Sequence, residues 1–204
     1  MNRMKFIIAT KNAHKVEEFQ RILEPLGITA VSQEEAGLDI SPEENADTFE
    51  GNSLLKAKAV QQAAGVPVIA DDSGLEVYAL GNAPGVYSAR YGGPGLSDGQ
   101  RTEKLLGEMR KIPDLQRGAR FVSCISLVLN GEKLYTFTGI CEGKIGHEPL
   151  GSNGFGYDPV FMVGEKSFAQ LSGKEKDAIS HRGKALRKMA EKLPVILAEN
   201  GIGE

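Results

Sequence analysis

Two adjacent acids are the residues best placed to do chemistry. Asp71 and Asp72 directly follow the apolar stretch "VPVIA" and precede Ser73 and Gly74. Neighbouring side chains of a strand point to opposite faces, so one acid can face a cleft while the other serves the structure. Carboxylates at the carboxyl end of a buried strand suit Mg²⁺, which prefers oxygen ligands. An Asx-type turn leaving the strand accounts for the pattern about equally well.

A polar segment, "TKNAHK" (residues 10–15), connects the first apolar strand to a helix. Backbone N–H groups at such a junction point toward an anion, and Lys15 adds positive charge. The commoner role of such residues is a helix cap, here from Thr10 or Asn12. The segment matches neither a Walker loop nor a Rossmann turn.

A basic segment, "KEKDAISHRGK" (residues 174–184), surrounds the expected start of the last helix. Cations at a helix N-terminus oppose the helix dipole unless an anion or a carbonyl oxygen occupies the site. A solvated basic face explains Lys184 and the residues beyond it, but explains "SHR" (residues 180–182) less well. The segment therefore predicts a negative or carbonyl-bearing ligand.

The segment "SNGFGYDPVF" (residues 152–161) holds Phe155 between Gly154 and Gly156. Each glycine costs roughly 0.5–1 kcal/mol inside a regular element, so the segment is a loop. A base stacked on an aromatic ring gains roughly 1–3 kcal/mol. With the acids and cations above, the ring predicts a nucleotide site. The net charge of −3 and pI near 5.7 argue against a nucleic-acid polymer and favour a free nucleotide.

Other polar residues carry weaker signals. Glu43 and Glu44 lie in an acidic loop over residues 33–47 and are solvated unless that loop folds over the Asp72 end of the sheet. His14 and His147 lack partners at metal-ligand spacing, which predicts surface positions. The sequence predicts that Cys124 and Cys141 are reduced, partly buried thiols.

The elements that must position these residues alternate between strands and helices, which predicts an α/β fold with a mixed sheet. No apolar run approaches the roughly 20 residues of a membrane helix, and "FIIAT" is too short for a signal peptide. Met4 offers an alternative start. The first half of the chain predicts a strand over 5–9, a helix stopped by Gly27, a helix from a capping box of Asp47 and Glu50 to Ala64, and a strand over 66–70. A helix over 98–111 and a hairpin around Asn130-Gly131 follow. The last expected element is a helix that is capped by Ser180 and turns Leu186, Met189 and Leu193 inward.

Five segments, "TKNAHK", "ADDSGLEV", "APGVYSARY", "GFGYDPVF" and "KDAISHRGKAL", occur in the order and spacing of the inosine triphosphate pyrophosphatase family. The chain resembles that family from about Lys5 to Leu193. The resemblance implies a single elongated domain over residues 1–204, with two lobes around a central mixed sheet flanked by helices and a nucleotide cleft between them. It also implies a cytoplasmic homodimer that depends on Mg²⁺ and contacts neither membrane nor nucleic-acid polymer.

The implied activity is hydrolysis of ITP, dITP and XTP to the monophosphate and pyrophosphate. By motif, Asp72 would be the general base and a metal ligand, Glu43 the second metal carboxylate, and Lys56 a helper. A phosphatase releasing orthophosphate and a nucleotide sensor without turnover remain alternatives. The residues implied to bind substrate are Thr10, Lys11, Asn12, Ala13, His14, Lys15, Ser73, Phe155, Gly156, Tyr157, Asp158, Lys176, His181 and Arg182.

The expected substrate order places ITP and XTP well above GTP, with ATP and pyrimidine triphosphates poor. Hypoxanthine and xanthine present a 6-oxo acceptor, which donors from Lys176, His181 or Arg182 can meet. Adenine presents a 6-amino donor at the same position. Two donors facing each other in a dry pocket both stay unsatisfied.

Overall fold

The computed structural model describes residues 5–202, so Met4 lies outside the described part. Seven strands form one sheet in the order β2-β1-β3-β4-β5-β6-β7. β1 pairs in parallel with β2 and β3, and the other neighbours are antiparallel. This confirms the predicted α/β fold with a mixed sheet. The strands are β1 (Lys5–Ile8), β2 (Thr29–Ser32), β3 (Val68–Val77), β4 (Gly118–Val128), β5 (Leu134–Ile145), β6 (Phe161–Val163) and β7 (Lys166–Ser167).

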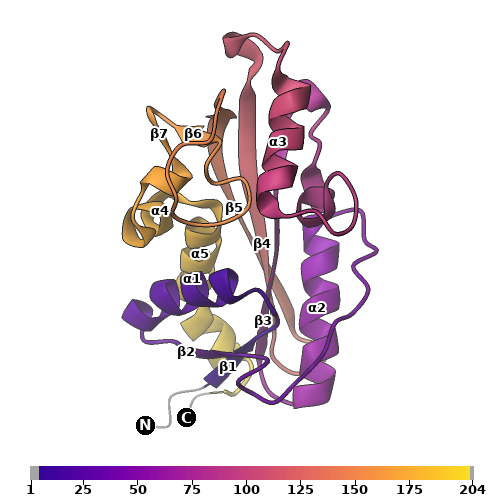
Figure 1. Ribbon diagram of the computed structural model, residues 1–204. Coiled ribbons are helices and arrows are strands. Elements are labelled where there is room, and N and C mark those ends of the chain that lie inside the picture. Colours follow the sequence, from indigo (N-terminus) through magenta and orange to yellow (C-terminus); the bar gives the residue numbers. More distant parts are fainter. Residues whose placement is uncertain (1–4, 203–204) are drawn as a thin grey trace.

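Helices cover both faces of the sheet. Figure 1 shows an elongated molecule in which α2 lies on one side of the sheet, α1 and α5 lie on the other, and α3 stands at the far end. No helix within residues 5–202 is both long enough and apolar enough to cross a membrane. The helices are α1 (Ala13–Leu23), α2 (Phe49–Ala64), α3 (Asp98–Met109), α4 (Gly173–Ile179) and α5 (His181–Glu199), with 3₁₀ turns at Glu24–Leu26, Tyr78–Leu80, Gly85–Arg90, Asp114–Gln116 and Phe168–Gln170.

Strand alternation divides the core between the two faces. Ile8 and Ile69 pack with the residues of α1 and α5, whereas their neighbours Ile7 and Ala70 pack under α2. On α5 the predicted inward residues Leu186, Met189 and Leu193 are buried in the first of these clusters. A third cluster, which includes Leu75, Phe121 and Phe161, fills the end of the sheet that lies away from β1 and β2.

The course of β3 differs from the prediction. The strand does not end before Asp71 but runs on to Val77, because β4 pairs with it from Val68 to Val77. The strand that ends here is β1, whose last pair with β3 joins Ile8 to Ile69. The two acids therefore lie within β3, just beyond the carboxyl end of its parallel neighbour, and the Asx-turn alternative is wrong.

The local turn predictions are confirmed at one place and corrected at another. β4 and β5 form the hairpin predicted around Asn130-Gly131, and Gly131 adopts a positive φ of 58°. The cap of α2 is Thr48, not Asp47. Thr48 has an extended backbone, and its hydroxyl accepts the N–H of Gly51.

The predictions for the cysteines and for His147 are largely confirmed. Cys124 and Cys141 are free thiols, as predicted, but both are buried and not only partly buried. His147 lies at the surface, where its Nε2 is 2.6 Å from Asp114 Oδ1. Among residues 5–202, no three His, Cys, Asp or Glu side chains gather as a ready metal site.

Replacement of Gly139 by alanine tests how closely β5 packs against α5. A Cβ at this position would lie 2.1 Å from the carbonyl oxygen of His181 and 2.6 Å from the N atom of Ala185. Both are backbone atoms, so α5 would have to shift. We expect Gly139→Ala to lower the free energy of unfolding by about 1–3 kcal/mol, measured as a lower urea midpoint at unchanged m.

The matched control is Gly107→Ala in α3, where a Cβ meets no atom within 4 Å. Alanine favours a helix by roughly 1 kcal/mol over glycine, so this variant should be as stable as the wild type or more so. Equal stability of the Gly139→Ala protein and the wild type would contradict the described packing.

Candidate active site

Two adjoining cavities open beside the end of β1. The acid pocket, about 290 Å³, is lined around Asp72 by residues that include Thr10, Lys15, Glu44 and Lys56. The ring pocket, about 280 Å³, is lined by residues that include Phe155, Gly156, Tyr157, Asp158, Lys176, His181 and Arg182. Asn12, Lys15, Ser73 and Ala89 line both. A ligand that extends from one cavity into the other would pass these four residues.

The start of α1 forms the shared wall. Thr10 Oγ1 accepts the N–H of Asn12, and Asn12 Oδ1 caps the helix by accepting the N–H of Lys15 at 3.2 Å. The capping role weighed from sequence is thus confirmed for Asn12. Lys15 turns inward, and its ammonium lies 2.8 Å from Asp71 Oδ2. Burial lowers the pKa of Lys15 below its ordinary value, although Asp71 opposes that effect.

The other residues of the predicted segment differ in their relation to the cavities. The side chains of Lys11, Ala13 and His14 are exposed. Lys11 pairs with Asp39 in the acidic loop and also lines the acid pocket, whereas Ala13 and His14 line neither the acid pocket nor the ring pocket. Of this segment, the structure therefore brings Thr10, Lys11, Asn12 and Lys15 to the cavities.

Asp71 points to the side of the sheet covered by α1 and α5. Its carboxylate accepts hydrogen bonds from Ser123, Ser73 and Arg182 at 2.6–2.9 Å. Burial alone would raise the pKa of Asp71, but Arg182 and Lys15 hold it well below its ordinary value. Asp71 is therefore a fixed anion that holds its neighbours in place.

Asp72 points to the opposite side, toward α2. Lys56 Nζ lies 2.9 Å from its Oδ1 and 3.0 Å from Glu44 Oε2. Burial raises the pKa of Asp72 even though Lys56 and Lys15 counteract it. Its Oδ2 is buried and has no hydrogen-bond partner within residues 5–202. The predicted division of roles between the two acids matches this geometry.

A divalent metal fits the carboxylates at this position. The unpartnered Oδ2 of Asp72 and the carboxylate of Glu44 offer the hard oxygen donors that such ions prefer. Glu43, the predicted second ligand, is exposed and does not line the acid pocket. The acidic loop does fold over Asp72, but it presents Glu44.

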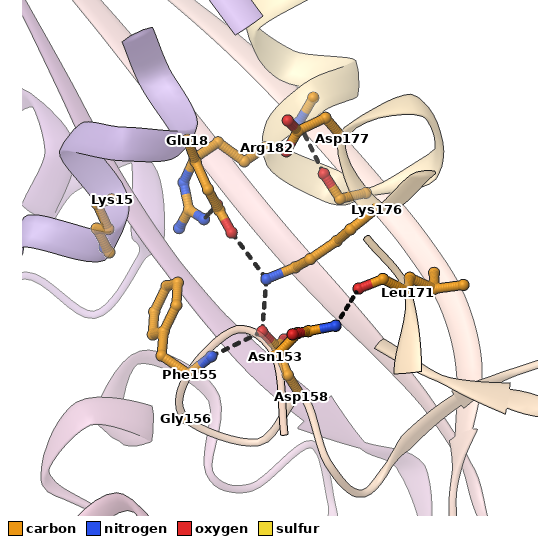
Figure 2. Close-up of polar contacts among 12 residues, drawn as sticks. Lys15, Glu18, Asn153, Phe155, Gly156, Asp158, Leu171, Lys176, Asp177 and Arg182 are labelled. Atoms are coloured by element: carbon orange, nitrogen blue, oxygen red, sulfur yellow. Dashed lines mark hydrogen bonds and ion pairs between the residues drawn. The ribbon is translucent and has the colours of Figure 1, made fainter. Parts of the chain in front are cut away.

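The glycine-framed loop is shaped by Asp158. Gly154 and Gly156 have positive φ angles of 73° and 60°. The chain thereby folds back, and Asp158 Oδ2 accepts the N–H of Phe155 at 3.0 Å (Figure 2). A Cβ on Gly154 would lie 2.0 Å from that oxygen, so the position requires glycine.

Phe155 is half-buried and separates the ring pocket from an outer cavity. His14 stacks on it with ring centroids 5.3 Å apart and an interplanar angle of 8°. This outer cavity is lined by residues that include His14, Arg21 and Gly173. Phe155 lines both the outer cavity and the ring pocket, whereas His14 does not line the ring pocket. Phe155 therefore still presents ring surface to the ring pocket.

Behind this loop, five buried charges alternate in sign from Asp158 through Lys176, Glu18 and Arg182 to Asp71. Lys176 Nζ lies 2.5 Å from Asp158 and 2.8 Å from Glu18, as Figure 2 shows. Arg182 contacts Glu18 and lies 2.9 Å from Asp71. We call these residues the charge chain. It connects the glycine loop, α4, α1, α5 and β3.

The basic segment predicted a negative or carbonyl-bearing ligand, and the charge chain shows that carboxylates of the protein itself meet two of its cations. Lys176 and Arg182 meet carboxylates of the protein itself, and Arg182 uses Nε, Nη1 and Nη2 for hydrogen bonds to Asp71, Glu18 and Ser73. Lys184 is exposed, as predicted. His181 is buried, stacks on Phe121, and has an unpartnered Nδ1 within residues 5–202. Burial, with Arg182 and Lys176 nearby, lowers the pKa of His181 well below its ordinary value.

The sequence patterns did not indicate a role for Glu18. It lies on α1 one turn beyond Lys15, next to the core residue Phe19. Its only local signal is an acid beside the apolar face of an amphipathic helix. Burial would raise its pKa, but Arg182 and Lys176 lower it to about 2.

The variant Glu18→Gln tests the charge chain through pH. The carboxylate has its pKa lowered from 4.5 to about 2, so it stabilises the fold above pH 4.5 and loses that effect as pH falls toward 2. We expect the variant to be less stable at neutral pH by on the order of 3 kcal/mol, because two buried cations lose their shared anion. The difference from the wild type should narrow on acidification.

Urea unfolding at a series of pH values measures this difference. Glu17→Gln is the control, because Glu17 is the exposed neighbour of Glu18 on the same helix and should behave as the wild type. A gap between the Glu18→Gln protein and the wild type that stays constant down to about pH 3 would show that ionised Glu18 does not stabilise the fold.

The chain is similar to proteins of one family along nearly all its length. The sequence model of the Ham1 family matches residues 6–192. The dITP/XTP pyrophosphatase of Bacillus subtilis is 47% identical over 189 residues, which cover 92% of this chain and 96% of that protein. The dITP/XTP pyrophosphatase of Photorhabdus laumondii is 45% identical over 194 residues, covering 93% and 98%.

Solved structures agree. The Staphylococcus aureus Ham1 protein is 40% identical and superposes with a TM-score of 0.82, covering 93% of this chain and 98% of that one. A Mycobacterium abscessus structure, described as a nucleoside-triphosphatase / dITP/XTP pyrophosphatase, is 41% identical with a TM-score of 0.72, covering 91% and 98%. The resemblance inferred from five sequence segments is thus confirmed, and the chain belongs to the Ham1 family.

Proposed function

We propose that this protein hydrolyses aberrant purine nucleoside triphosphates, namely ITP, dITP and XTP, to the monophosphate and pyrophosphate. The observation that carries the proposal is the pair of adjoining cavities. One presents a buried carboxylate oxygen that has no hydrogen-bond partner in the described part of the chain and lies beside two lysines, and the other presents an aromatic ring. The names of the relatives from Bacillus and Photorhabdus support the same activity.

The acid pocket would take the triphosphate. Asp72 would orient a water molecule with its carboxylate and accept its proton during in-line attack on the α-phosphorus. Asp72 and Glu44 would hold Mg²⁺, which when bound neutralises phosphate charge and lowers the pKa of water. The exposed position of Glu43 makes Glu44 the better candidate for the second carboxylate.

Two lysines would stabilise charge on the phosphates. Lys15 reaches both cavities from α1, and Lys56 lies against Asp72 from α2. Ammonium groups fixed before the reaction can stabilise the charge that develops on the departing pyrophosphate. Lys56 also favours the ionised form of Asp72, which a general base requires.

The ring pocket would take the purine. The base would stack on Phe155, and donors near the ring would meet the 6-oxo group of hypoxanthine or xanthine. Lys176 Nζ lies 5.0 Å from the centre of the Phe155 ring, which places a cation at this site. We therefore keep the substrate order expected from sequence, with ATP poor.

The organisation of the protein completes the proposal. We infer one domain of two lobes with the nucleotide between them, acting as a cytoplasmic homodimer that binds neither membrane nor nucleic-acid polymer. Size-exclusion chromatography with light scattering tests the homodimer directly.

The variant Asp72→Asn tests the general base. We expect kcat with ITP to fall by at least ~10², because asparagine cannot accept the proton. Affinity for the product IMP should change little, because Asp72 would act in the reaction and not in binding of the purine. Measurement of IMP and pyrophosphate release over time decides the point. Turnover close to that of the wild type would remove Asp72 from the mechanism, whereas binding of ITP without release of IMP and pyrophosphate by the wild type itself would favour the sensor alternative.

The matched variants Glu44→Gln and Glu43→Gln test the second metal carboxylate. We expect Glu44→Gln to raise the Mg²⁺ concentration that gives half-maximal activity by about tenfold or more, the usual range for losing a group that holds a metal. Glu43→Gln should match the wild type, since its side chain lies outside the acid pocket. The reverse pattern would restore Glu43 as the ligand.

A further inference from the structure

An arginine of α3 reaches the ring pocket with one nitrogen that has no hydrogen-bond partner among the described residues. Arg101 lines this cavity, and its side chain is only 13% exposed. Its Nε is buried and has no hydrogen-bond partner within residues 5–202. Its Nη1 forms an ion pair with the largely exposed Asp98 at 3.7 Å, a distance beyond hydrogen-bond range.

The other buried arginines show how unusual this is. Arg182, on the same cavity, donates from every nitrogen of its guanidinium. Arg117 donates to the carbonyl groups of Met109, Ile112, Ile145 and Gly146. Buried polar groups are nearly always hydrogen-bonded, and an unpaired one destabilises the protein. A hydrogen-bond acceptor for the Arg101 guanidinium is therefore to be sought in the cavity that it lines.

The position of Arg101 indicates which part of a nucleotide it meets. It lines the ring pocket but not the acid pocket, where the proposed function places the phosphates. Asp98, one turn earlier on α3, accepts the N–H of Gly156 at 2.9 Å and so holds α3 against the Phe155 loop. Arg101 thus stands near the stacking ring, at the nucleoside end of the site.

We infer that Arg101 donates a hydrogen bond to an exocyclic oxygen of the purine and is a specificity-determining residue for oxopurines. A guanidinium carries only donors, so it needs an acceptor. Hypoxanthine and xanthine supply oxo groups at the ring edge, whereas adenine presents an amino group that would face another donor. This inference rests on the proposed function and adds a residue to it.

The test compares Arg101→Met with the wild type on two ligands that differ by one oxygen. IMP carries the 6-oxo group, and purine riboside monophosphate lacks it. Calorimetry should show that the wild type binds IMP more tightly, and that the variant loses this preference. The affinity of the variant for IMP should fall by about 10- to 100-fold, the range for a hydrogen bond to a charged group, while affinity for purine riboside monophosphate should change by less than about 2-fold.

Three controls make the result specific. Arg110→Met removes an exposed arginine at the end of the same helix and should leave both affinities unchanged. Arg101→Lys keeps a donor and should retain part of the preference for IMP. Thermal melting should show Arg101→Met folded, with a Tm no lower than that of the wild type, because an unpaired buried group is removed.

The outcomes separate the inference from the proposed function. Equal losses for both ligands would mean that Arg101 contacts the ribose, the phosphate or the fold, and would overturn the inference. An unchanged preference for IMP would overturn it too. Because binding needs no turnover, a wild type that prefers IMP but releases no pyrophosphate from ITP would refute the proposed function alone. In an active wild type, kcat/KM for ITP should fall in the Arg101→Met protein by the same factor as the affinity for IMP.

Discussion

The charge chain from Asp158 to Asp71 is the interaction on which the rest of the site depends. Each of its five charges is buried, and removing any one would leave an uncompensated charge in the interior. Its members come from five separate elements, so the glycine loop, α4, α1, α5 and β3 can take only positions that satisfy all the pairs together. Residues of those elements form part of the walls of both cavities. Ion pairs contribute little to stability at a protein surface, but these buried pairs fix the geometry of the site.

Strand alternation then gives two adjacent acids opposite properties. Asp71 lies on the side of the charge chain, where cations and hydroxyls hold its pKa low. Asp72 lies on the other side, where burial raises its pKa and one oxygen has no hydrogen-bond partner between residues 5 and 202. One residue of offset in a strand is enough to separate a structural anion from a group available for chemistry. Pairing with β4 fixes the face of the sheet on which each acid lies, because the pairs between β3 and β4 continue on both sides of Asp71 and Asp72.

Local sequence rules predicted the features that depend on neighbours along the chain. These are the hairpin at Asn130-Gly131, the inward face of α5 and the opposite orientation of the two acids. Features set by distant contacts could not be predicted in this way. β3 continues past Asp71 because β4 pairs with it, and Glu18 is buried because two cations more than 150 residues away meet it. The choice between Glu43 and Glu44 depends on how a loop without regular structure folds, which their shared charge does not reveal.

We propose that water, oriented by Asp72, attacks the α-phosphorus. The most direct measurement is turnover of ITP in ¹⁸O-labelled water, followed by mass spectrometry of the products. Attack at the α-phosphorus places the label in IMP and leaves pyrophosphate unlabelled. Label in orthophosphate or in pyrophosphate, with IMP unlabelled, would place the attack at another phosphorus and contradict the account.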